Sequence, residues 1–211
     1  MKHLEMADVL SLCDLPKYQA RANHNWQKAG LTDLFSPQHY PLLQYLARRF
    51  DKDVLELGAG TRLSTLCLAS GLTAGRSVCS TDVVYPTISA AVDLVGLPAV
   101  VYNEDCVDFL VASDESLFDF IFIDVDHSGV AERKILRHLL ENNWTGCVLL
   151  DDARAGQELK KIITEQIAMG LDVYDLTRWG HWSGSLLVSF GMPLDCRCSG
   201  TRLLPLKNFW S

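Results

Sequence analysis

The sequence predicts an α/β protein built on one doubly wound sheet of about seven strands, with the last strand antiparallel. From residue 53 onward, short apolar runs alternate with helical patterns, which is typical of βαβ units and a parallel sheet. Two of these runs, 118–124 and 147–151, are almost continuously apolar, as central strands covered on both faces are. A glycine turn also follows the first run and precedes a helical pattern.

The chain of 211 residues has the length of one α/β domain, and residues 1–211 are predicted to form it in three successive parts. Residues 1–51 show helical periodicity and are predicted to be an N-terminal helical cap. Residues 52–190 carry the alternating pattern and form the predicted core. Residues 191–211 are irregular in pattern and are predicted to be a C-terminal tail.

The predicted strands and helices can each be assigned to a stretch of the sequence. The predicted strands are the apolar runs 53–57, 77–82, 99–103, 118–124, 147–151, 172–176 and 185–190. No clear helix precedes the last run, so this strand is expected to pair antiparallel. In the cap, helices are expected near residues 4–12, near residues 18–26, and after Ser36-Pro37, where serine can cap and proline can occupy the first turn.

The composition argues against nucleic-acid and membrane partners. With a formal net charge of -7 and no dense Lys/Arg run, the chain is expected to have no nucleic-acid partner, because a phosphate backbone would repel it. No apolar stretch reaches the ~18 residues that span a bilayer, so no membrane partner is expected. Seven cysteines, an odd number, and the lack of a signal-peptide pattern favour free thiols and a cytoplasmic location.

Acidic side chains gather where the predicted strands end. In doubly wound sheets, ligands bind outside the carboxyl ends of the strands. Acids lie at or near the ends of the first five predicted strands, as Glu56, Asp82, Asp105, Asp124, Asp151 and Asp152. The sequence therefore predicts a ligand site at this edge of the sheet.

The first predicted strand leads into the glycine turn, which reads VLELGAG. Gly58 and Gly60 allow a tight turn and let the backbone at Ala59 approach a ligand. The third glycine of a dinucleotide-binding turn is replaced by Leu63, which argues against an NAD-dependent oxidoreductase. The carboxylate of Glu56 would repel a pyrophosphate, but it would attract the ammonium group of an amino acid.

This turn resembles the E-x-G-x-G motif of the class I S-adenosylmethionine-dependent methyltransferases, which have a Rossmann-like core. The resemblance implies that S-adenosylmethionine is the cofactor and that it is bound by Glu56, Gly58, Ala59, Gly60, Asp82, Asp105 and Asp124. Asp82 would accept hydrogen bonds from the ribose hydroxyls. Asp105 either contacts the adenine, caps the next helix, or does both. Arg62 departs from the family, since many members have a small residue there.

The segments FDFIFIDVDHSG and CVLLDD bring four carboxylates, Asp124, Asp126, Asp151 and Asp152, to adjacent strand ends. Converging carboxylates repel one another, so a cation or protons must offset their charge. Oxygen ligands of this kind suit Mg²⁺. A metal site is therefore favoured over the simpler interpretation that these acids only cap helices or face solvent.

The same pattern resembles the cation-dependent small-molecule O-methyltransferases, both the catechol type and the sugar enzymes of macrolide and aminocoumarin biosynthesis. The resemblance implies that Asp124, Asp151 and Asp152 bind Mg²⁺. It also implies that Asp126, the second acid of D-x-D, is the base. The catechol type has a lysine where this chain has His127, whose ordinary pKa suits a base better. Asp126 and His127 are therefore the two candidate catalytic residues.

The function predicted from these residues is Mg²⁺-dependent O-methylation of a small hydroxylated metabolite. The alternatives are a metal-independent methyltransferase, a non-catalytic S-adenosylmethionine-binding protein and, with less support, an NAD-dependent oxidoreductase. The sequence does not determine the oligomeric state, for which a homodimer is one expectation. Between the last two predicted strands, the loop with Trp179, His181 and Trp182 is predicted either to wall a substrate pocket or to pack on the surface.

Overall fold

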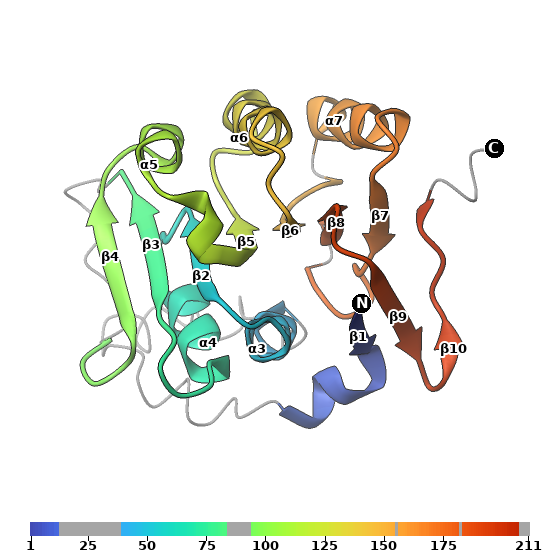
Figure 1. The fold of residues 1–211 in the computed structure, drawn as a ribbon, viewed down its shortest axis with the longest axis horizontal. Helices are drawn as coiled ribbons and strands as arrows, with labels where there is room; N and C mark the ends of the chain where they lie inside the picture. The colour runs from blue at the N-terminus through green and yellow to red at the C-terminus, as the bar shows by residue number, and fades with distance from the viewer. Residues whose placement is uncertain (13–38, 84–93, 155, 182, 207–211) are drawn as a thin grey trace.

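The computed structural model describes residues 1–12, 39–83, 94–154, 156–181 and 183–206, which contain a seven-stranded mixed sheet with helices on both faces (Figure 1). Its strands are β2 (Asp53–Leu57), β3 (Val78–Asp82), β4 (Ala99–Asn103), β5 (Phe118–Ile123), β6 (Gly146–Leu150), β7 (Asp172–Asp175) and β8 (Leu186–Phe190). In space they lie in the order β4-β3-β2-β5-β6-β8-β7.

This sheet confirms the predicted fold class. Strands β2 to β6 pair in parallel, whereas β8 runs antiparallel to both β6 and β7. The predicted runs 53–57 and 99–103 coincide with β2 and β4, and the other five differ from their strands by one residue at one or both ends. Every residue of β5 and β6 is buried, as their almost continuously apolar sequences require.

Helices cover both faces of the sheet. They are α3 (His39–Arg49), α4 (Leu63–Gly71), α5 (Cys106–Ala112), α6 (Val130–Glu141) and α7 (Gln157–Ala168), with a short 3-10 turn, η3 (Glu115–Leu117). Helices α3 and α4 lie on one face, and α5, α6 and α7 lie on the other (Figure 1). Side chains alternate along β5, so Phe120 and Phe122 join the core under α3 and α4, while Ile121 and Ile123 join the core under α6 and α7.

The two ends of the chain form a second sheet of three strands, which the sequence analysis missed. β1 (Lys2–Glu5) pairs in parallel with β9 (Leu194–Cys198), and β10 (Thr201–Arg202) pairs antiparallel with β9. The helix expected near residues 4–12 therefore begins only at Met6, after a strand, and the tail that was predicted to be irregular contains two strands. The cause is physical, because a four-residue strand is stable only against a partner strand and leaves little local signal.

The rest of the cap is described in part. Residues Met6–Leu12 form a 3-10 helix, η1, and α3 is the helix expected after Ser36-Pro37. The helix expected near residues 18–26 lies outside the described residues. Within the described ranges, no helix is both long and apolar enough to cross a membrane, and none of the six described cysteines forms a disulfide.

Candidate functional site

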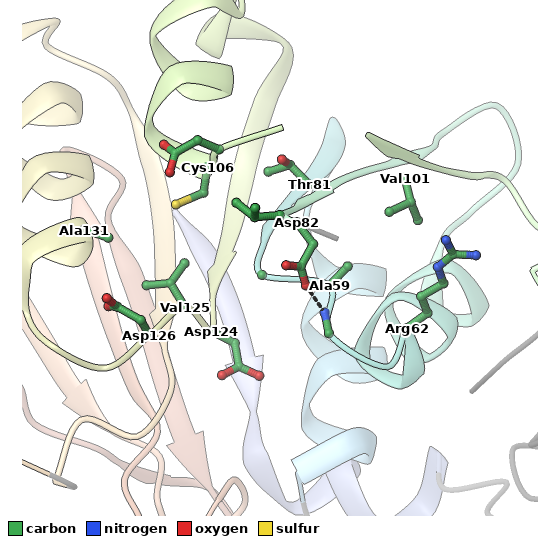
Figure 2. A pocket seen from close by; sticks show the side chains of 14 residues that line it. Ala59, Arg62, Thr81, Asp82, Val101, Cys106, Asp124, Val125, Asp126 and Ala131 are labelled. Atoms are coloured by element: carbon green, nitrogen blue, oxygen red, sulfur yellow. Dashed lines mark hydrogen bonds between the residues drawn. The ribbon is translucent and has the colours of Figure 1, made fainter. Parts of the chain in front are cut away.

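A cavity of about 640 Å³ opens at the carboxyl ends of β2, β3 and β5 (Figure 2). This volume is typical of small-molecule sites. Of the seven residues predicted to bind the cofactor, six line it, namely Gly58, Ala59, Gly60, Asp82, Asp105 and Asp124. A cavity is therefore present at the edge of the sheet where the sequence predicted a ligand site, and most of the residues predicted to bind the cofactor line it.

Gly58 is required by the close approach of two backbone segments. Its φ of +102° lies in the region that favours glycine, and a Cβ atom there would lie 1.9 Å from the carbonyl oxygen of Asp124. The Gly58 amide donates to the carbonyl of Thr81 at 2.9 Å, and the Asp124 amide donates to that of Leu57 at 2.9 Å. The first glycine of the motif thus lets the turn after β2 pass against the end of β5.

Gly60 has a different role. A Cβ atom there would meet no atom of the described residues within 4 Å, so among them this glycine leaves open space beside the cavity. Its amide donates to a carboxylate oxygen of Asp82, and the two are joined by a dashed line in Figure 2. Asp82, at the end of β3, therefore holds the glycine turn in place. Arg62 has a left-handed backbone with φ of +67° and lines the same cavity.

Glu56 is fully buried and is absent from the cavity lining. Its Oε2 atom accepts hydrogen bonds from the hydroxyls of Thr65 and Ser80, each at 2.5 Å. Its Oε1 atom has no hydrogen-bond partner among the described residues. Burial raises the pKa of Glu56, although the neighbouring hydroxyls of Ser64, Ser80 and Thr65 oppose the shift. The orphaned oxygen is suited to a donor such as an ammonium group or a water molecule.

Asp105 caps helix α5 and lines the cavity as well. Its Oδ1 atom accepts from the amides of Val107 at 2.8 Å and Asp108 at 3.2 Å. The capping role is therefore present, and the adenine contact stays a prediction. Beside it, the first residue of α5, Cys106, also lines the cavity.

Carboxylates and imidazoles form a continuous chain of contacts along the ends of β5 and β6. His127 Nε2 lies 3.5 Å from Asp124 Oδ1 and 3.1 Å from Asp152 Oδ2. His181 Nδ1 lies 3.0 Å from Asp152 Oδ1 and 3.9 Å from Asp151 Oδ2. We name these five residues the Asp–His chain. Burial, together with the charges of Asp151 and Asp152, raises the pKa of Asp124 well above its usual range.

The centre of the Asp–His chain has an unusual backbone. His127 has a φ of +56° and Asp152 a φ of +51°, both in the left-handed region that residues other than glycine seldom adopt. Such conformations persist only where surrounding contacts impose them, and they cluster at functional sites. Here the two left-handed residues are the pair that meets at 3.1 Å.

The topology of the sheet brings His181 to this edge. Because β7 is antiparallel to β8 and so parallel to β6, the loop between β7 and β8 returns at the carboxyl end of β6. Two backbone hydrogen bonds fasten it there, from Ala153 to Gly184 at 3.0 Å and from Arg154 to Ser183 at 2.7 Å. The antiparallel last strand had placed this loop among the sequence candidates as a candidate pocket wall, but the sequence did not predict the contacts of His181 with Asp151 and Asp152.

The other residues singled out in the sequence, Asp126, Trp179 and Trp182, are not members of the Asp–His chain. Asp126 lines the cavity, and its Oδ1 atom accepts from the amide of Ser128 at 3.1 Å and from its hydroxyl at 2.9 Å. It therefore closes a turn and, within the described part of the chain, its side chain makes no hydrogen bond or ion pair with the Asp–His chain. Trp179 is buried in the core and Trp182 lies outside the described residues. Trp179 therefore neither lines the cavity nor packs on the surface.

Three side chains of the Asp–His chain lie close enough to hold one cation. Asp151, Asp152 and His181 each offer one ligand atom, and these atoms lie within 4.8 Å of one another. The sequence prediction placed Asp124 in the third position, whereas the structure has an imidazole nitrogen there. Asp124 lies beside this group through its contact with His127.

The sequence matches no protein-family model and no curated protein. Similar folds occur among solved structures. A protein from Corynebacterium glutamicum has a TM-score of 0.61 and 15% identity, covering 88% of this chain and 94% of that one. A methyltransferase from Geobacter sulfurreducens has a TM-score of 0.57 and 15% identity, and the match covers 72% of this chain and 79% of that one. A candidate caffeoyl-CoA O-methyltransferase from Staphylococcus aureus has a TM-score of 0.58 and 16% identity, and the match covers 86% of this chain and 99% of that one. The chain therefore has the Rossmann-like fold found in these methyltransferases.

Proposed function

We propose that this protein transfers the methyl group of S-adenosylmethionine to a hydroxyl group of a small hydroxylated metabolite, assisted by a divalent cation. One observation carries the proposal. The glycine turn after β2 and the carboxylate at the end of β3 line the same cavity as Asp124 and Asp126 after β5. The proposed cofactor cradle thus shares one hollow with two of the carboxyl groups, those of Asp124 and Asp126, in a fold found in methyltransferases.

The charge of the cavity favours a cationic ligand. Four carboxylates line it, those of Asp82, Asp105, Asp124 and Asp126, against one guanidinium group, that of Arg62. A sulfonium and an ammonium group are attracted by such a lining, whereas a pyrophosphate is repelled. When bound, S-adenosylmethionine supplies an electrophilic methyl group on its positively charged sulfur.

The Asp–His chain supplies a base. If Nε2 of His127 donates to Asp152, the neutral ring has its lone pair on Nδ1, which can then accept the proton of a substrate hydroxyl. The carboxyl groups of Asp124 and Asp152 flank the ring, at 3.5 Å and 3.1 Å from Nε2, and hold it in place. A cation at Asp151 and Asp152 would lower the pKa of that hydroxyl. We therefore favour His127 over Asp126 as the base.

A thermal melt tests the cofactor. Saturating S-adenosylmethionine, at about 100 times its dissociation constant, should stabilise the protein by roughly 2.7 kcal/mol and raise Tm by several degrees. NAD at the same concentration should leave Tm unchanged. No shift with S-adenosylmethionine would overturn the proposal, and a shift with NAD alone would favour an oxidoreductase.

Turnover is tested with a panel of catechols and sugar diols, by following formation of S-adenosylhomocysteine. Product with at least one hydroxylated acceptor is the expected result. A cofactor-dependent melting shift without turnover on any acceptor would instead favour the non-catalytic binding protein. Turnover that persists after chelator treatment would favour the metal-independent methyltransferase.

The open space at Gly60 gives a second binding test. In Gly60→Ala the new methyl group meets none of the described residues within 4 Å and occupies space beside the cavity, so affinity for S-adenosylmethionine should fall about tenfold or more. Gly75→Ala is the matched control, because Gly75 also has a positive φ, of +86°, and open space around its Cβ, but lies outside the cavity lining. Equal affinities of the two variants, measured by calorimetric titration, would contradict this role of Gly60.

A further inference from the structure

We infer that Asp151, Asp152 and His181 form a site for a divalent transition metal that binds imidazole, such as Zn²⁺, Fe²⁺ or Co²⁺, rather than for Mg²⁺. The inference concerns the cation of the proposed methyl-transfer site. It can be tested by binding alone, without methyl transfer.

The donor set is the first argument. Mg²⁺ takes oxygen ligands in octahedral geometry, whereas imidazole suits Zn²⁺, Fe²⁺, Ni²⁺ and Cu²⁺. Here a ring nitrogen of His181 lies 3.0 Å from one carboxylate and 3.9 Å from the other. Two ligands that each lie about 2.1 Å from one ion are roughly 3.0 to 3.4 Å apart, so small side-chain shifts would complete the site.

The surroundings hold these ligands in place. The hydroxyl of Ser185 donates to Asp151 Oδ1 at 3.3 Å, and the hydroxyl of Ser183 contacts Asp152. The backbone amide of His181 donates to Ser185 Oγ at 2.8 Å, so the same serine contacts two members of the site. Partners of this kind orient metal ligands and contribute to affinity.

The burial of the three side chains fits a catalytic metal. The side chain of Asp151 is 7% exposed, that of Asp152 20% and that of His181 26%, so the site is mostly enclosed yet reachable. Three protein ligands leave coordination positions for water or a substrate oxygen, as in catalytic zinc sites. His127 contacts Asp152 Oδ2, whereas His181 contacts Oδ1, so His127 is placed to orient the shared carboxylate.

Metal titration of the full chain tests the inference. Chelator-treated protein should bind one equivalent of Co²⁺, seen as visible absorption bands, and Zn²⁺ should displace it. Mg²⁺ at millimolar concentration should not displace it. His181→Ala should lower Zn²⁺ affinity about tenfold or more, and change Mg²⁺ affinity less than threefold, since only the nitrogen donor is lost.

His138→Ala is the control, because His138 is on α6, away from the site, and contacts Asn142. Displacement of Co²⁺ by Mg²⁺, or Zn²⁺ affinity that is unchanged in His181→Ala, would overturn the inference. If metal-free His181→Ala does not fold, His181→Asn provides the same comparison with an oxygen donor. Intact Zn²⁺ binding without any melting shift from S-adenosylmethionine would overturn the proposed function and leave the metal site standing.

Discussion

Gly58→Ala is expected to lower the free energy of unfolding by about 3 kcal/mol, a large share of the stability of a domain this size. The reason is the overlap of two backbone segments. An added Cβ would lie 1.9 Å from the carbonyl oxygen of Asp124, and a backbone atom cannot move aside as a flexible side chain can. Separating the segments would disturb the hydrogen bond from Asp124 to Leu57, which joins the ends of β5 and β2. Urea denaturation measures the change.

Gly170→Ala is the control for backbone strain alone. Gly170 has a φ of +87°, near that of Gly58, but a Cβ there would meet no atom within 4 Å in the part of the chain that the structure describes. Gly170→Ala should therefore lower the free energy of unfolding by only about 1 kcal/mol. If the two variants lost similar amounts of unfolding free energy, backbone strain, and not the contact with Asp124, would be what makes glycine necessary at position 58.

The second large effect is expected at His127. His127→Asn should lower kcat by about 10²- to 10⁴-fold, the usual contribution of a general base. Asparagine is the chosen replacement because it tolerates the left-handed backbone at this position, where φ is +56°, but its amide cannot accept the proton. Folding should therefore be preserved, which a thermal melt without ligand checks.

Asp126→Asn separates the two candidate bases. Its amide oxygen can still accept from the amide and hydroxyl of Ser128, so the turn is kept while the carboxylate is lost. We expect a loss of less than about tenfold in kcat, with Co²⁺ binding measured in both variants as a check on the metal site. A loss confined to Asp126→Asn would assign the base to Asp126, as the resemblance to the sugar enzymes implies.

Much of the fold could be predicted from local sequence. The run FDFIFI reads as a buried strand because both of its faces are apolar, and β5 is buried throughout. The missing helix before the last run indicated the antiparallel β8. The glycine turn and the acids after each strand indicated the cavity edge, because parallel strands all end on one side of a sheet.

The sequence by itself therefore predicted the sheet, the edge at which the cavity opens and half of the residues that line the cavity. Only the tertiary structure decided which side chains meet there. His181 and Asp152 are 29 positions apart, and their contact depends on the path of the loop before β8. The pairing of β1 with β9 joins residues near opposite ends of the chain. No local periodicity records such contacts, because they are set by how the elements pack and by where each loop is fastened.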